Sequence, residues 1–171
     1  GVLIWKPSLG ILNPLIVGGG QEHGFRSGTE NTPSLFLTSL WLKQLPLLME
    51  GFEPVKKFKE VFEAQISQLI PSSKPIGGEY ERLKNTSAIC IPGVLADHLI
   101  PALDFLGIMA SSGSACNHGT QEPSKSYLSM GVSWEDARCV IRFSFGCQNL
   151  KISPIELASK ISDTVKKVAG K

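Results

Sequence analysis

A cysteine in a run of small residues is the strongest candidate for covalent chemistry in this sequence. Cys116 ends the segment Ser111-Ser112-Gly113-Ser114-Ala115-Cys116 and is followed by Asn117-His118. A nucleophilic thiol needs access to its substrate and partial ionisation, and small flexible neighbours permit access. His118 is a candidate to assist the ionisation. A Ser/Gly linker with an incidental cysteine is the alternative interpretation of the same residues.

A second candidate is a glycine-rich segment, residues 18–31. Five of its first eleven residues are glycine, which allows backbone conformations whose amide groups converge on an anion. Arg26, Ser27 and Thr29 add a guanidinium group and two hydroxyl groups, as a phosphate or carboxylate site requires. The segment lacks the Gly-Lys-Ser/Thr of a P-loop and is not a dinucleotide-binding fingerprint. A structural turn that merely tolerates glycine is the alternative.

The third candidate is Arg142, in a segment that alternates as a strand. Residues 139–145 place apolar side chains on one face, namely Ile141, Phe143 and Phe145. Arg142 points to the other face with Val140 and Ser144. A planar guanidinium group is the usual partner for a substrate carboxylate in two hydrogen bonds, although an arginine on a short strand can also be simply solvated.

The remaining cysteines do not form a recognisable site. Cys90 and Cys139 lie in strand-like runs and are expected in the core, whereas the position of Cys147 is left open. No Cys-x-x-Cys pair indicates zinc, so no metal site is predicted. Free thiols in a reducing compartment are favoured over a disulfide scaffold, which is typical of smaller secreted chains.

These residues must be positioned by short helices and strands. Helical spacing and capping signals predict helices over residues 32–50, with Thr32 as N-cap and Pro46 bending or ending the helix, and over 54–70, 95–106, 123–131 and 154–168. Strands are expected over residues 1–5, 86–91, 108–110 and 139–145. The predicted fold class is α+β, with helices packed on one side of a small, mainly antiparallel sheet.

Composition excludes several classes of protein. The 171 residues are 42% hydrophobic and 19% charged, with a net charge of +2. This composition is not that of a disordered tail, and the charge indicates neither nucleic acid nor an anionic membrane as a partner. Apolar runs fall short of the ~20 residues of a membrane span. Because no secretory signal is visible, we expect a cytoplasmic protein, with organellar import left open.

Taken in order, three motifs resemble those of one enzyme family. They are Gly-Gly-Gly-Gln-Glu-x-Gly-x-Arg-Ser-Gly-Thr at 18–29, Ser-Ser-Gly-Ser-Ala-Cys at 111–116 and Ile-Arg-Phe-Ser-x-Gly at 141–146. The sequence resembles cysteine desulfurases and the similar selenocysteine lyases, which are pyridoxal-phosphate enzymes of the class V aminotransferase group. The resemblance implies the small C-terminal domain of a fold-type I enzyme over residues 32–171, and a remnant of the large cofactor domain over residues 1–31.

The resemblance also implies a role for each candidate residue. Cys116 is the catalytic nucleophile, which attacks the sulfur of cofactor-bound L-cysteine and leaves L-alanine and a persulfide on Cys116. Arg142 binds the substrate carboxylate, with Arg26 also assigned to substrate binding. In the glycine-rich loop, Thr29 binds the phosphate of pyridoxal phosphate in the other subunit of a homodimer. Two neighbours in that loop, Ser27 and Gly28, are also assigned to the cofactor.

Two departures from the family pattern limit this interpretation. The family's Schiff-base lysine lies a few residues upstream of position 1, so we expect this chain alone to be inactive and to bind no cofactor. Asn117-His118 stands where many relatives have small hydroxyl residues, which leaves L-selenocysteine open as the substrate. A sulfur-acceptor protein, as in iron–sulfur cluster assembly, is the implied partner. A non-enzymatic persulfide carrier and a degenerate domain with structural cysteines are the alternatives.

Overall fold

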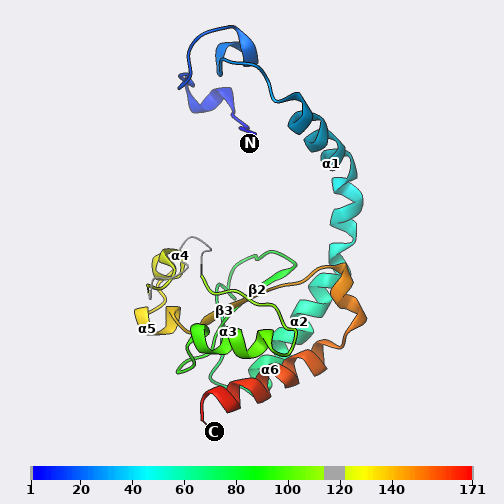
Figure 1. The fold of residues 1–171 in the computed structure, drawn as a ribbon, viewed down its shortest axis with the longest axis vertical. Helices are drawn as coiled ribbons and strands as arrows, with labels where there is room; N and C mark the ends of the chain where they lie inside the picture. Colours follow the sequence, from blue (N-terminus) through cyan, green and yellow to red (C-terminus); the bar gives the residue numbers. More distant parts are fainter. Residues whose placement is uncertain (1, 114–121, 171) are drawn as a thin grey trace. The chain divides into compact units, whose positions relative to one another are not determined.

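The computed structural model describes residues 2–113 and 122–170, and the chain divides into two compact units, Gly1–Pro46 and Leu47–Lys171. The first unit contains two short 3-10 helices, η1 (Pro7–Leu9) and η2 (Gln21–Gly24), and most of α1 (Thr32–Glu50). The helices of the second unit are α2 (Phe52–Leu69), α3 (Ala96–Asp104), α4 (Lys125–Ser129), α5 (Trp134–Ala137), η4 (Cys147–Lys151) and α6 (Pro154–Val168) (Figure 1).

The sheet of the second unit has three antiparallel strands in the order β1 (Lys74–Pro75), β2 (Thr86–Cys90) and β3 (Val140–Ser144). In the central pairing, Ala88 lies opposite Arg142 and Ile89 opposite Ile141. The α+β class and the antiparallel sheet are therefore confirmed. The predicted division into a large-domain remnant over residues 1–31 and a small domain over residues 32–171 stays a prediction.

One face of the sheet carries the main core. The helices α2, α3 and α6 pack there, and Figure 1 shows them grouped beside β2 and β3. The side chain of Phe62 on α2 is fully buried, with ring centroids 5.3 Å from Phe143 and 5.2 Å from Phe145. The predicted apolar face of β3 is thus confirmed, since its side chains at 141, 143 and 145 are all buried in this cluster.

The opposite face of the sheet carries a smaller cluster. Its buried members come from β2, from β3 and the residue before it, and from the α4 and α5 region, namely Cys90, Tyr127, Ala137, Cys139 and Val140. The predicted one-sided helical layer therefore holds for the three long helices of this unit, while α4 and α5 add a partial cover to the second face.

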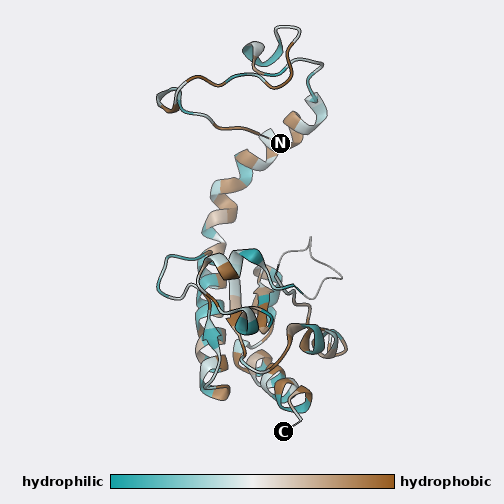
Figure 2. Ribbon diagram, turned by 90° about the vertical axis from the view of Figure 1, so that its left-hand side faces the viewer, coloured by the Kyte–Doolittle hydropathy of each residue, from teal (hydrophilic) through white to brown (hydrophobic). Residues whose placement is uncertain are grey.

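Two helix starts show how local sequence sets an element. The Ser153 hydroxyl accepts a hydrogen bond from the Glu156 amide at 3.3 Å, and Pro154 is the first residue of α6, as predicted. At α1 the cap is Asn31, whose Oδ1 accepts from the Ser34 amide at 3.2 Å, so the prediction of Thr32 as N-cap was wrong by one residue. Helix α1 continues through Pro46, and Figure 2 shows apolar residues along its length.

Two predicted strands are absent from the residues that the structure describes. Residues 2–5 and 108–110 have no strand conformation, and the second run continues only into an isolated bridge between Ser111 and Arg142. Positive φ angles at Gly107 and Gly113 interrupt the extended backbone on either side of this run. An apolar run predicts burial, but a strand also needs a hydrogen-bonded neighbour along its length. Within the same residues, no helix combines the length and apolar character that crossing a bilayer requires.

Candidate functional site

The candidate site is built around Arg142 on β3. Strand alternation places its side chain on the face opposite the main core, where it is half-buried. Its backbone amide donates to the Ser111 carbonyl at 2.7 Å, and the Ser111 amide donates to the Arg142 carbonyl at 3.0 Å. This reciprocal pair fixes the first residue of the Ser-Ser-Gly-Ser-Ala-Cys motif against the strand that carries the arginine.

A close contact joins the residues on either side of positions 114–121. Gly113 has a φ of +52°, and a Cβ added there would lie 3.1 Å from the Cβ of Ser124. Ser124 is itself buried and accepts at its carbonyl from the Tyr127 amide at 3.0 Å. The backbone that leads from Ser111 and the backbone that leads into α4 therefore lie side by side. The predicted nucleophile Cys116, and His118 beside it, lie outside the described residues.

Tyr127 is a residue near Arg142 that the sequence interpretation missed. It is buried in the small cluster with Cys90 and Val140, which lie opposite one another on β2 and β3. Burial raises the pKa of the Tyr127 phenol, and the positive charge of Arg142 opposes that rise. The phenol is therefore neutral at pH 7. No local sequence signal singles out Tyr127, because its neighbours in this cluster come from strands far away along the chain.

The glycine-rich loop is held together by its own polar groups. The Ser27 hydroxyl donates to the Gly19 carbonyl at 3.0 Å, and the Gly28 amide donates to Oε1 of Gln21 at 3.3 Å. Ser27 is buried, whereas Arg26 and Thr29 are exposed. The Ser27 hydroxyl and the Gly28 amide thus serve the fold of the loop, and the assignment of these two residues to the cofactor stays a prediction.

The exposed groups of this loop fit a phosphate. A guanidinium group at Arg26 and a hydroxyl at Thr29 are donors of the kind that phosphate oxygens accept. Gly28, between them, has a φ of +100°, a conformation that glycine adopts without strain. On donor chemistry, therefore, the loop suits the phosphate of pyridoxal phosphate, and Arg142, in the other compact unit, suits a carboxylate.

The described cysteines have two kinds of environment. Cys90 and Cys139 are buried, as predicted, and burial raises the pKa of the Cys90 thiol to about 12. Cys147 is exposed, with its Sγ 3.6 Å from the Gly51 carbonyl oxygen. Among the residues placed by the structure, no three His, Cys, Asp or Glu side chains are grouped so as to hold a metal ion.

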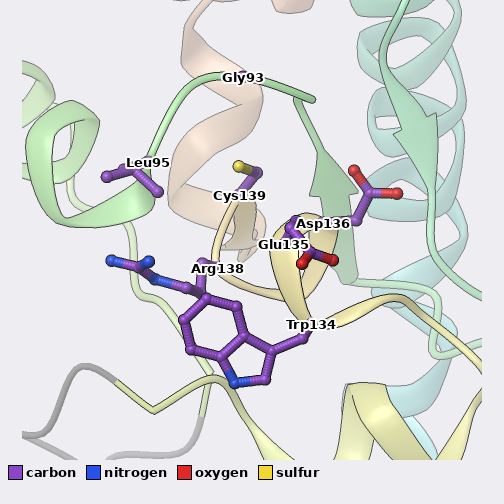
Figure 3. Close-up of a pocket in the computed structure, with 7 residues that line it drawn as sticks. All are labelled: Gly93, Leu95, Trp134, Glu135, Asp136, Arg138 and Cys139. Carbon is purple, nitrogen blue, oxygen red and sulfur yellow. The ribbon is translucent and has the colours of Figure 1, made fainter.

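A cavity of about 230 Å³ lies elsewhere in the second unit. Figure 3 shows its lining, which consists of Gly93, Leu95, Trp134, Glu135, Asp136, Arg138 and Cys139. The Arg138 guanidinium carbon lies 4.8 Å from the centroid of the Trp134 ring, so its charge already has a partner. Since Arg142 is not part of this lining, the cavity is separate from the candidate site.

Comparisons with known proteins agree with the motifs. The family model for aminotransferase class-V matches residues 1–152. A cysteine desulfurase from Cereibacter sphaeroides is 35% identical over 133 residues, covering 77% of this chain and 33% of the relative. The cysteine desulfurase NifS from Azotobacter vinelandii is 34% identical over 132 residues, with the same coverage. The chain thus spans about a third of the length of these relatives.

Solved structures give the same result for the fold. The X-ray structure of a NifS-like protein from Rickettsia africae ESF-5 matches with a TM-score of 0.68 and 26% identity, over 96% of this chain and 42% of that one. SspA in complex with cysteine matches with a TM-score of 0.50 and 25% identity, over 78% of this chain and 35% of that one. The resemblance to cysteine desulfurases inferred from the sequence motifs is confirmed.

Proposed function

Because the chain belongs to the class-V aminotransferase family, we propose that it is the cysteine-bearing part of a cysteine desulfurase that uses pyridoxal phosphate. The single observation that carries this proposal is the hydrogen-bonded pair of Ser111 and Arg142. It ties the segment that contains Cys116 to the strand that presents a carboxylate-binding group. Cys116 follows Ser111 by five residues in the sequence.

In the proposed reaction, Arg142 binds and orients the substrate. Its planar fork donates two parallel hydrogen bonds to the α-carboxylate of L-cysteine, which fixes the direction of the substrate side chain. The half-buried position of Arg142 strengthens this interaction relative to an exposed arginine. The related protein SspA was solved in complex with cysteine, which supports this choice of substrate.

The Cys116 thiolate then acts as the nucleophile. It attacks the substrate sulfur, a new S–S bond forms, and the bond between the substrate sulfur and its β-carbon breaks. When bound, pyridoxal phosphate supplies the electron sink that accepts the electron pair left on the β-carbon. Protonation of that carbon gives L-alanine, and Cys116 keeps the transferred sulfur as a persulfide. No external oxidant or reductant is required.

The glycine-rich loop is proposed to serve the cofactor of a second subunit. Thr29 and Arg26 are exposed donors of this loop and would bind the cofactor phosphate across a homodimer interface. The large domain and the Schiff-base lysine are supplied by residues outside this chain. On this proposal residues 1–31 belong with that large domain and residues 32–171 form the small domain.

The persulfide is proposed to pass to an acceptor protein. Iron–sulfur cluster assembly is a use of such sulfur that suits the relatives named NifS. A reducing compartment, the cytoplasm, agrees with the free thiols of the described cysteines, Cys90, Cys139 and Cys147.

The test is alanine release from L-cysteine by the complete protein that contains this chain, purified with pyridoxal phosphate. We expect C116S to abolish release, with C147S as the matched control that keeps the wild-type rate. Persulfide trapped on Cys116 by alkylation and mass spectrometry is the second expected result. Wild-type alanine release by C116S would overturn the proposal, and the 171-residue chain alone is expected to release none.

Thiol labelling separates this function from a degenerate domain with structural cysteines. We expect the Cys116 thiol to react with a disulfide reagent at pH 8 far faster than Cys90, whose pKa of about 12 leaves almost no thiolate. Equal, slow labelling of the two thiols would contradict a nucleophilic role. Competition between L-cysteine and L-selenocysteine in the alanine assay distinguishes a desulfurase from a selenocysteine lyase.

A further inference from the structure

The small cluster on the second face of the sheet contains the aromatic residue Tyr127, and the side chain of Arg142 projects from the same face. Val140 and Arg142 are two residues apart on β3, so their side chains share a face. Tyr127 is buried in the cluster that includes Val140 and Cys90. The ring of Tyr127 therefore covers the same face from which the Arg142 side chain projects.

The cross-strand neighbour of Arg142 supports this placement. Ala88 lies opposite Arg142 in the register of β2 and β3, and Ala88 packs against the cluster that contains Tyr127. Opposite residues on one face of an antiparallel pair have Cβ atoms about 5 Å apart. A methyl group at Ala88 leaves room beside the arginine stem, and Tyr127 is the bulky ring of this cluster.

A second set of contacts, made by residues on either side of positions 114–121, also connects Arg142 with Tyr127. Arg142 is hydrogen-bonded to Ser111, Gly113 lies against Ser124, and Ser124 accepts from the Tyr127 amide. Sheet packing and this chain of contacts thus both place α4 beside Arg142. The influence of the Arg142 charge on the Tyr127 phenol agrees with this placement.

We propose that Tyr127 is a positioning residue for Arg142, with its ring forming a wall that restricts the guanidinium group to the orientation that binds the substrate carboxylate. This inference rests on the proposed function. A side chain as long as arginine loses much conformational entropy when it is fixed, and a wall that fixes it in advance lowers the cost of binding. We assign this effect to the ring of Tyr127, which is buried among the hydrophobic residues of this cluster.

Steady-state kinetics of the complete enzyme test the inference through a double-mutant cycle. We expect Y127A to raise KM for L-cysteine about tenfold with kcat within about twofold, because the guanidinium group is then no longer held in the orientation that binds the carboxylate. Y127F, which keeps the ring, is expected within about twofold of wild type. On an R142K background, Y127A is expected to add little further increase in KM. Additive effects, or an equal loss in Y127F, would overturn the inference.

Chemical modification gives a readout that does not depend on activity. In the 171-residue chain, phenylglyoxal should modify Arg142 several-fold faster in Y127A than in wild type or Y127F, as measured by mass spectrometry. Arg138, which stacks on Trp134, is the internal control and should keep its rate. Unchanged modification of Arg142 overturns the inference.

If thermal unfolding shows that Y127A does not fold, Y127L keeps bulk at the site and is expected to give a smaller change in the same direction. Absence of alanine release by the wild-type enzyme would count against the proposed function, whereas the modification experiment would still decide the role of Tyr127.

Discussion

The two compact units of the chain use their apolar residues differently. Every buried apolar side chain among the described residues lies in Leu47–Lys171, on the helices, strands and loops of the two clusters. In the described part of Gly1–Pro46, Ser27 is the buried residue, and apolar side chains such as Leu15 and Trp41 are exposed. Local polar contacts hold the glycine-rich loop, whereas a continuous core holds Arg142.

This difference in burial agrees with the roles proposed for the two units. In the proposed function Arg142 orients the substrate, and a strand backed by a packed core supplies a rigid support for that role. The loop of residues 18–31 presents exposed donors, and its shape depends on hydrogen bonds such as those from Ser27 and Gly28. The comparison predicts that substitutions in the second unit affect global stability and that substitutions in the first unit do not.

The largest effect is expected from Phe62→Ala. Phe62 is a fully buried residue of α2 that packs against the rings of Phe143 and Phe145. Its removal therefore leaves a cavity. We expect a loss of about 3–5 kcal/mol in the free energy of unfolding, measured by urea denaturation. Trp41→Ala on exposed α1 is the matched aromatic control and should cost under about 0.5 kcal/mol. Equal losses would remove the distinction between the two units.

The next effect concerns a polar network that joins α2 to β2 and the loop before it. Glu63 accepts two hydrogen bonds from Arg82, at 2.8 and 2.7 Å, and one from Ser87 at 2.6 Å. Burial alone would raise the pKa of Glu63, but these hydrogen bonds and the positive charges of Arg82 and Lys59 outweigh burial and lower it. The ionised carboxylate therefore stabilises the folded state at neutral pH.

Glu63→Gln tests this network and its pH dependence. We expect a loss of about 1.5–3 kcal/mol at pH 7, because hydrogen bonds to a charged group are removed. A lowered folded pKa means that the contribution is present above the ordinary pKa of 4.5 and is lost as pH falls through the folded pKa. The variant should therefore lose less stability than wild type on acidification. Glu53→Gln, at an exposed ion pair with Lys84, is the control and should change little.

The sequence predicted those features that depend on neighbouring residues. The cap and proline at the start of α6 and the alternation in β3 are local patterns, and the structure confirms both. Residues 108–110 were predicted as a strand from hydropathy, but only the next residue, Ser111, pairs with another strand, through an isolated bridge to Arg142. Pairing depends on which segments meet in space, and hydropathy does not contain that information.

The candidate site was predictable only in part, for the same reason. Arg142 could be identified because alternation and the family motif both single it out. Tyr127 could not, since the role proposed for it depends on neighbours on β2 and β3 that lie far away in sequence. The assignment of Ser27 to the cofactor came with the family resemblance and stays a prediction, and its hydroxyl donates to the Gly19 carbonyl within the loop.

A smaller effect is expected from Gly113→Ala, which alters the contact next to Arg142. The substitution places a Cβ 3.1 Å from the Cβ of Ser124 and forces alanine to a φ of +52°. We expect a loss of about 2 kcal/mol in unfolding free energy, from strain and displacement together. Gly93→Ala is the matched control, because its φ is +81° but nothing lies within 4 Å, so about 1 kcal/mol is expected. Identical losses would show that the contact with Ser124 does not matter.

The smallest effect compares one serine hydroxyl from each unit. Ser153 caps α6, a helix that packs along α2 in the main core, so Ser153→Ala should cost about 1 kcal/mol in global unfolding. Ser27→Ala removes the hydroxyl that bonds to Gly19, yet the loop contributes nothing to that core. We therefore expect the urea midpoint to be unchanged in Ser27→Ala, while hydrogen exchange over residues 16–28 becomes faster. A lowered urea midpoint in Ser27→Ala would mean that the loop and the core unfold as one unit. Such cooperative unfolding requires coupling between the loop and the packed core, and the distinction between the two units would then fail.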